Sequence, residues 1–146
     1  MSYNDAVEEA LCYGWIDSTV RSLDETSTIQ RYSPRRPGST YSQPNKERLR
    51  WLAGENRLHP SIKAAVQSIL SEKYRFPCDI LEEIKKDKPA WKNYLRFPDS
   101  YRRIRIAYID SARKRPEEFE RRLKSFIAAT RRNKMTGYGG IEKYYR

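Results

Sequence analysis

The sequence predicts an α+β protein with a mainly helical body and a short N-terminal antiparallel β-hairpin. Two observations carry this prediction. Residues 15–33 contain two short runs rich in β-branched and aromatic residues around a polar turn, which is typical of a hairpin. From residue 42 onward, apolar residues recur at three- and four-residue spacing between proline and glycine signals, which is typical of amphipathic helices.

The length of 146 residues fits one domain with a sizeable core. We therefore predict a single domain over 1–146, in which 1–45 form a helix, the hairpin and an Arg/Pro-rich loop, 46–132 form the helical part, and 133–146 form a tail. Hydrophobic residues make up only 38% of the chain, but three Trp, eleven Tyr and four Phe favour a folded protein over a disordered one.

The N-terminal elements have clear start and stop signals. A first helix is expected after the cap candidates Ser2 and Asn4, with Val7, Ala10 and Leu11 on its apolar face and Gly14 as its stop. The hairpin strands "WIDSTVRSL" and "TIQRYS" then flank the turn "DETS". Pro34 and Pro37 end the second strand because proline donates no hydrogen bond to a ladder.

Further helices follow along the rest of the chain. One begins after Ser42, with Pro44 in its first turn and Gly54 at its end, and a second is expected over residues 61–72. Four more segments have start signals, which are Asp79 as a cap, Pro89, Asp99 or Ser100, and Pro116.

The last two helices have predicted apolar faces. The members on the final helix are Phe119, Leu123, Phe126, Ile127 and Thr130, and those on the preceding helix are Tyr101, Ile104, Tyr108, Ile109 and Ala112.

The net charge of +11 lies almost wholly in the second half. Residues 1–73 carry 10 Lys and Arg against 9 Asp and Glu, whereas residues 74–146 carry 20 against 10. This asymmetry is typical of a partner such as nucleic acid, an anionic membrane or an acidic protein, with a solvated basic surface as the alternative. The candidate nucleic-acid contacts are Arg102, Arg103, Arg121, Lys124, Arg131 and Arg132.

The stretch "QRYSPRRPGSTYSQPN", residues 30–45, indicates an anion site. Arginine offers a planar fork of donors for phosphate or carboxylate, and prolines restrict the loop so that these donors are positioned in advance. The ligand-binding candidates are Trp15, Asp17, Tyr32, Ser33, Arg35, Arg36, Tyr41 and Asn45. In the alternative interpretation, Asp17 pairs with Arg35, the aromatic residues belong to the core, and the loop pins the hairpin to a helix.

Residues suited to catalysis are scarce. His59 is the single histidine and stands in a turn, where a surface or capping role is expected. Cys12 is expected to be a small core residue, and Cys12 and Cys78 show neither metal-ligand spacing nor a disulfide framework. The adjacent Glu8 and Glu9 are expected to be solvated. We therefore predict no cofactor, no metal and no catalytic residue, and favour binding over catalysis.

An enzyme acting on a small anionic substrate remains a third hypothesis beside a ligand-binding protein and a nucleic-acid-binding protein. A small molecule bound between Trp15 and Arg35 would favour it. No apolar run reaches the roughly 20 residues that cross a bilayer, and the first residues lack a targeting pattern, so a cytoplasmic location is expected.

Three blocks of the chain resemble the YdeI/OmpD-associated family, also called the bacteriocin-protection family. They are "DAVEEALCYGWIDS", the stretch 30–45, and "LEEIKKDKPAWKNYLRFPDSYRRIRIAYIDSARK". The resemblance extends from Tyr3 to about Arg132. It implies a link to envelope stress, porins and resistance to antimicrobial peptides, and it brings no catalytic mechanism or cofactor.

The chain departs from this family's pattern in two places. Glu118 and Phe119 stand where a threonine-arginine pair is usual, and a tryptophan-containing strand usually precedes the first helix. If that strand is absent, the hairpin has an exposed edge, and exposed edges tend to be paired or covered. We therefore expect a homodimer through this edge or a contact between tail and sheet. The tail itself is expected to be partly mobile or to dock on the body.

Overall fold

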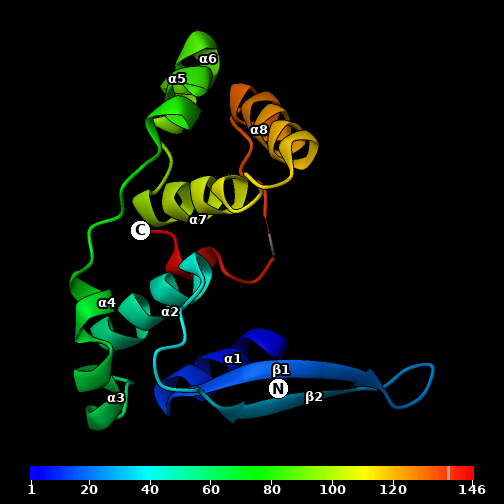
Figure 1. The fold of residues 1–146 in the computed structure, drawn as a ribbon, viewed down its shortest axis with the longest axis vertical. Helices are drawn as coiled ribbons and strands as arrows, with labels where there is room; N and C mark the ends of the chain where they lie inside the picture. The colour runs from blue at the N-terminus through cyan, green and yellow to red at the C-terminus, as the bar shows by residue number, and fades with distance from the viewer. Residues whose placement is uncertain (138) are drawn as a thin grey trace. The chain divides into compact units, whose positions relative to one another are not determined.

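The computed structural model describes residues 1–137 and 139–146, and these divide into two compact units, 1–72 and 73–146. Each unit is described by itself, and the single domain over 1–146 stays a prediction. The first unit contains α1 (Tyr3–Cys12), β1 (Trp15–Ser22), β2 (Thr28–Pro34), α2 (Gln43–Gly54), α3 (Pro60–Ala65) and α4 (Gln67–Ser71). The second contains α5 (Cys78–Lys86), α6 (Lys88–Tyr94), α7 (Asp99–Asp110), α8 (Pro116–Arg131) and the 3₁₀-helix η1 (Glu142–Tyr144) (Figure 1).

The α+β class is confirmed, because helices dominate both units and the sheet is a two-stranded antiparallel hairpin. The start of α1 is fixed by a capping box, in which the Ser2 hydroxyl accepts from the Asp5 amide and the Asp5 carboxylate accepts from the Ser2 amide. Gly14 follows at a φ of +74°, a conformation that costs little only for glycine, and the chain turns there into β1.

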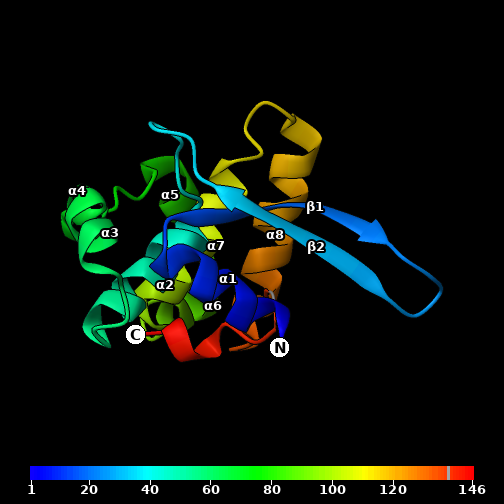
Figure 2. The same cartoon turned by 90° about the horizontal axis from the view of Figure 1, so that it is seen from below.

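The hairpin register places Trp15 opposite Pro34, Ile16 opposite Ser33, and Asp17 opposite Tyr32, before an irregularity between Asp17 and Val20. Figures 1 and 2 show α1 lying along the hairpin, with the turn of the hairpin extending beyond the helix. Among the described residues neither outer edge has a strand partner, and dimerisation through an edge stays a prediction.

The first unit closes around a small apolar cluster in which α1 and α2 meet α3 and α4. Its buried members are Val7, Leu11, Cys12, Leu49, Leu52, Leu58 and Val66. The single helix predicted over 61–72 is wrong in one respect, because the backbone leaves helical geometry at Val66 and separates α3 from α4. The break keeps Val66 buried while Ile69 and Leu70 still pack against the same cluster.

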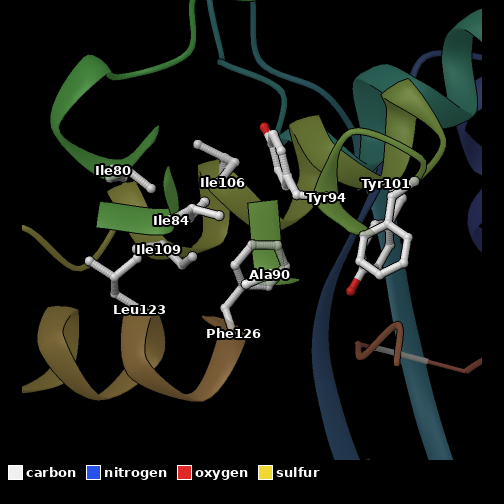
Figure 3. Packing of buried hydrophobic residues seen from close by; sticks show 10 residues of the cluster. Ile80, Ile84, Ala90, Tyr94, Tyr101, Ile106, Ile109, Leu123 and Phe126 are labelled. Atoms are coloured by element: carbon white, nitrogen blue, oxygen red, sulfur yellow. The ribbon is translucent and has the colours of Figure 1, made fainter. Parts of the chain in front are cut away.

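The second unit has the larger core, formed by α5, α6, α7 and α8. Figure 3 shows Leu123 and Phe126 pointing from α8 toward the apolar side chains of the other three helices. The predicted apolar face of α8 is confirmed by these two residues and by the buried Thr130. On α7 the prediction omitted Ile106, which is fully buried because α7 lies against core residues over a wider arc than one stripe.

The described part of the tail docks on α7. Ile141 and Tyr144 are buried, the Ser100 hydroxyl donates to the Tyr144 carbonyl at 2.8 Å, and the Thr136 amide donates to the Tyr101 hydroxyl at 2.8 Å. Of the two behaviours expected for the tail, these residues show docking on the body. Tyr138 of the predicted tail lies outside the described residues. In the described part of the chain, no helix has both the length and the apolar character needed to span a membrane.

Candidate anion-binding site

Arg35 is the first residue after β2, and three contacts fix its position. Its amide donates to the Gly14 carbonyl at 3.0 Å, which ties the start of the loop to the end of α1. Its Nη2 donates to the Thr40 carbonyl at 2.6 Å, and its guanidinium carbon lies 3.7 Å from the centre of the Tyr41 ring. The guanidinium is therefore held in one orientation by the loop that follows it.

The other two nitrogens of this guanidinium are buried without a partner. Within the described residues, Nε and Nη1 of Arg35 have no hydrogen-bond acceptor. Each buried donor left without an acceptor costs about 1–3 kcal/mol, and more when the group is charged. Arg35 thus presents two desolvated cationic donors that a carboxylate or phosphate oxygen would satisfy.

Within the part of the chain that the structure describes, Asp17 and Arg35 do not form the ion pair that the alternative interpretation required. The Asp17 Oδ2 instead accepts from the Tyr3 hydroxyl at 2.7 Å, and the two Arg35 nitrogens remain without an acceptor in the described chain. Burial, together with the hydrogen bond to Asp17, raises the pKa of Tyr3 to about 12, so this hydroxyl stays protonated and donates to the carboxylate.

A small hollow lies between α1, the start of β1 and the Arg35 loop, with an empty volume of about 160 Å³. Its polar lining comes from Asp17, Arg35 and Asn45, and its apolar lining includes Ala10 and Trp15. The Asn45 side-chain oxygen already accepts from Arg48 Nη1 at 2.9 Å. In this conformation the hollow has no room for a water-sized sphere, so an anion reaches Arg35 only when the loop yields.

An open apolar groove adjoins this hollow, because Ala10 and Trp15 line both. Its volume is about 410 Å³, and its other walls include Ala6, Tyr13 and Tyr32. Trp15 is 42% exposed and Tyr13 is 56% exposed, so the aromatic surface is open to solvent. The site therefore combines a cationic end with an apolar, accessible side.

Six of the eight predicted ligand residues come together here. Trp15, Asp17, Arg35 and Asn45 line the hollow, Tyr32 lines the groove, and Tyr41 stacks under Arg35. The other two do not join them. Ser33 pairs with Ile16 and falls on the opposite side of the strand from Tyr32, because side chains alternate along a strand, and Arg36 is exposed.

Tyr3, Ala10 and the Thr40 carbonyl are parts of the site that the sequence reasoning did not name as site residues. Tyr3 had a usable signal, because it precedes Val7 and Ala10 at four- and seven-residue spacing and so shares the face of α1 that packs on the hairpin. The Thr40 carbonyl had none, since any residue supplies this acceptor.

The predicted nucleic-acid residues of the second unit are mostly engaged with carboxylates. Arg102 pairs with Asp99, Arg121 with Glu118 at 2.7 Å, Lys124 with Glu120 at 3.4 Å, and Arg131 with Asp87 at 3.1 Å.

Glu118 also accepts from Arg122, and the two arginines lower the pKa of Glu118 to about 2. Arg103 is half-buried and Arg132 is exposed. The excess positive charge of this half is therefore partly neutralised where the prediction placed contacts.

The residues considered for catalysis have structural surroundings. His59 caps α3, with its Nδ1 accepting from the Ser61 amide, as predicted. Cys12 is buried, which raises the pKa of its thiol, and Cys78 is exposed and free. The expectation of a solvated Glu8 is wrong, because Glu8 is buried and pairs with Arg57 at 2.9 Å. In the described chain no group of His, Cys, Asp or Glu side chains has a metal-binding arrangement.

Comparison with known proteins finds two family models that divide the chain. Residues 73–133 match the family described as "Bacteriocin-protection, YdeI or OmpD-Associated", and residues 1–65 match a domain of unknown function, DUF8412. The expected resemblance began at Tyr3, whereas the match to the first of these families begins at residue 73. Comparison with curated proteins and with solved structures gives no match.

Proposed function

We propose that this chain, whose residues 73–133 match the Bacteriocin-protection, YdeI or OmpD-Associated family, is a cytoplasmic binding protein that takes up a small anion at Arg35 of its first unit. The match to this family implies no particular reaction for this chain. The site lies in residues 1–65, which match the domain of unknown function. The proposal for this site therefore depends on its geometry.

One observation supports the proposal most strongly: two buried donors of Arg35 have no acceptor among the residues that the structure describes. The loop holds the guanidinium through Thr40 and Tyr41, and Nε and Nη1 are the donors that it leaves without an acceptor in the described chain. Guanidinium N–H groups form charge-assisted hydrogen bonds with carboxylate and phosphate oxygens. A bound oxyanion that accepts from Nε or from Nη1 would remove the desolvation cost of that donor.

The biological setting is proposed from the resemblance alone. Proteins of this family are associated with envelope stress and with resistance to antimicrobial peptides and bacteriocins. A protein that binds an anionic ligand or an acidic partner without transforming it fits such a role, and we propose no cofactor for it.

The test is a calorimetric titration of the full chain with acetate and with inorganic phosphate at neutral pH. We expect saturable binding of at least one of them, and loss of that binding in Arg35→Gln. Arg31→Gln is the matched control, because Arg31 is an exposed arginine of the same hairpin that lies outside the hollow. Equal anion binding by the parent and the Arg35→Gln variant would contradict the proposal.

A second candidate function, nucleic-acid binding by α7 and α8, is supported by the 20 Lys and Arg against 10 Asp and Glu in residues 74–146. Phosphate contacts release counterions, so the affinity for an oligonucleotide should fall by orders of magnitude between roughly 50 and 200 mM salt. Replacing Arg132 and Lys124 together should reduce this salt dependence. No binding at the lower salt concentration would leave these helices as a solvated basic surface.

A further inference from the structure

Three features of the first unit lie at or beside Trp15, and together they restrict the class of ligand that the site can bind. Arg35, with two buried donors that have no acceptor in the described chain, and Asp17 both line the hollow. The apolar groove begins at the same indole ring. We propose that the ligand of this site is a free α-amino acid with an aromatic or large aliphatic side chain, an inference that rests on the proposed anion binding at Arg35.

The carboxylate of Asp17 makes a simple anion a poorer ligand for this site than one that also carries a hydrogen-bond donor. A carboxylate in the same hollow repels an incoming anion unless the ligand also offers a hydrogen-bond donor to it. Tyr3 occupies Oδ2 of Asp17 at 2.7 Å, and burial with this hydrogen bond raises the pKa of Tyr3, so the phenol does not compete as a second anion. Once the loop has moved to open the hollow, an α-ammonium group beside the ligand's carboxylate would donate to Asp17 while the carboxylate binds Arg35.

A second acidic side chain lines the adjoining groove. Glu9 lines the apolar groove next to Ala6 and Ala10, and its only described ion pair is a long one, 3.8 Å to Arg57. One carboxylate lining the hollow and another lining the groove favour a ligand that carries a positive charge in addition to its anionic group. A zwitterion has both charges at neutral pH.

The groove gives the third requirement. Its walls near Trp15 are apolar and aromatic, its volume is about 410 Å³, and Ala6 and Ala10 leave space where larger side chains of α1 would fill it. A phenylalanine or leucine side chain extending from the hollow would bury itself against Trp15, Tyr13 and Tyr32. Aromatic pairs of this kind add stabilisation beyond the area that they bury.

The experiment compares three probes of one skeleton by calorimetry on the full chain. L-phenylalanine has both charges, 3-phenylpropanoate has only the carboxylate, and phenethylamine has only the ammonium group. We expect L-phenylalanine to bind at least about tenfold more tightly than either relative, since each lacks one charge-assisted hydrogen bond. Asp17→Asn should remove most of the preference over 3-phenylpropanoate while acetate binding persists.

Ala6→Leu tests the groove separately. Leucine is a strong helix former, so α1 should be retained, while its side chain would occupy the groove. We expect the affinity for L-phenylalanine to fall at least about tenfold, by the loss of an apolar pocket of this size, with acetate binding unchanged.

The outcomes separate the two proposals. If acetate and 3-phenylpropanoate bind through Arg35 as tightly as L-phenylalanine, and Asp17→Asn changes nothing, the amino-acid inference is overturned and the anion site stands. If phosphate alone binds through Arg35, the result is the same. If Arg35→Gln leaves every titration unchanged, the anion site falls and the amino-acid inference falls with it.

Discussion

Arg35→Met separates a binding arginine from a structural one. Methionine keeps the length and the apolar stem of the side chain and removes all five donors. The variant loses the hydrogen bond to Thr40, worth about 1.5–3 kcal/mol for a charged donor, and the contact over Tyr41, worth about 0.5–2 kcal/mol.

The same substitution removes a cost. The two buried donors without acceptors are relieved, at about 1–3 kcal/mol each, and the thioether of methionine keeps an attraction of about 0.3–1.5 kcal/mol for the Tyr41 ring. Gains and losses are of similar size, so we expect the free energy of unfolding of the first unit to change by no more than about 1 kcal/mol.

The assay is urea unfolding followed by tryptophan fluorescence in a Trp91→Phe background. Trp15 and Trp51 then report the first unit alone, because Trp91 is the one tryptophan in residues 73–146. Arg57→Met is the matched control in the same unit. It leaves the buried Glu8 carboxylate without its arginine and should destabilise by about 2 kcal/mol or more, at the lower end for a buried pair because Arg57 is partly exposed.

A loss of more than about 3 kcal/mol in Arg35→Met would refute the reasoning, since values of that size mark a broken structural network. The guanidinium would then have a structural role, in which it holds the loop against the hairpin. A change near zero, combined with lost anion binding, would identify an arginine that is kept at a cost to stability.

Three further predictions concern the fold. Gly14→Ala should destabilise by at least about 1–2 kcal/mol, because φ is +74° and the new Cβ would lie 2.8 Å from the flexible Cδ1 of Ile62; equilibrium unfolding of the Trp91→Phe background measures it. Phe126→Ala should cost about 3–5 kcal/mol in the second unit, read from Trp91 fluorescence; a change below about 1 kcal/mol would contradict the core in Figure 3. Glu118 has a folded pKa of about 2, below its ordinary 4.5, so its contribution to stability is complete above pH 4.5 and is lost as the pH falls toward 2. Glu118→Gln should therefore weaken the pH dependence of the free energy of unfolding between pH 4.5 and 2. An unchanged pH dependence in this variant would contradict the pairing of Glu118 with Arg121 and Arg122.

Much of the local structure could be predicted because its causes are local. The cap at Ser2, the stop at Gly14 and the proline at the start of α8 act within a few residues, and the structure has each of them. Asp79 was expected to cap α5 but lies inside its first turn, where it pairs with Arg113 at 2.8 Å. A partner 34 residues away decides its role, and no local pattern reveals that partner.

For the site too, features with local causes could be predicted from the sequence, whereas those that depend on residues far along the chain could not. The chemistry of the Arg35 loop and the aromatic residues near it are visible in the sequence, and their grouping follows from the hairpin register. Glu8 was misjudged because its partner Arg57 comes 49 residues later. Likewise, only the packed structure shows that Arg35 is anchored by one nitrogen and buried without acceptors at the other two.

The most direct test of the anion site is the NMR signal of the Arg35 Nε–H group in ¹⁵N-labelled protein, assigned by its absence from an Arg35→Lys sample. We predict that acetate or L-phenylalanine moves this signal to lower field in a saturable way, because the proton gains its first hydrogen-bond acceptor. An Arg35 signal that stays unmoved, while side-chain signals of other arginines shift with the same ligands, would contradict the account.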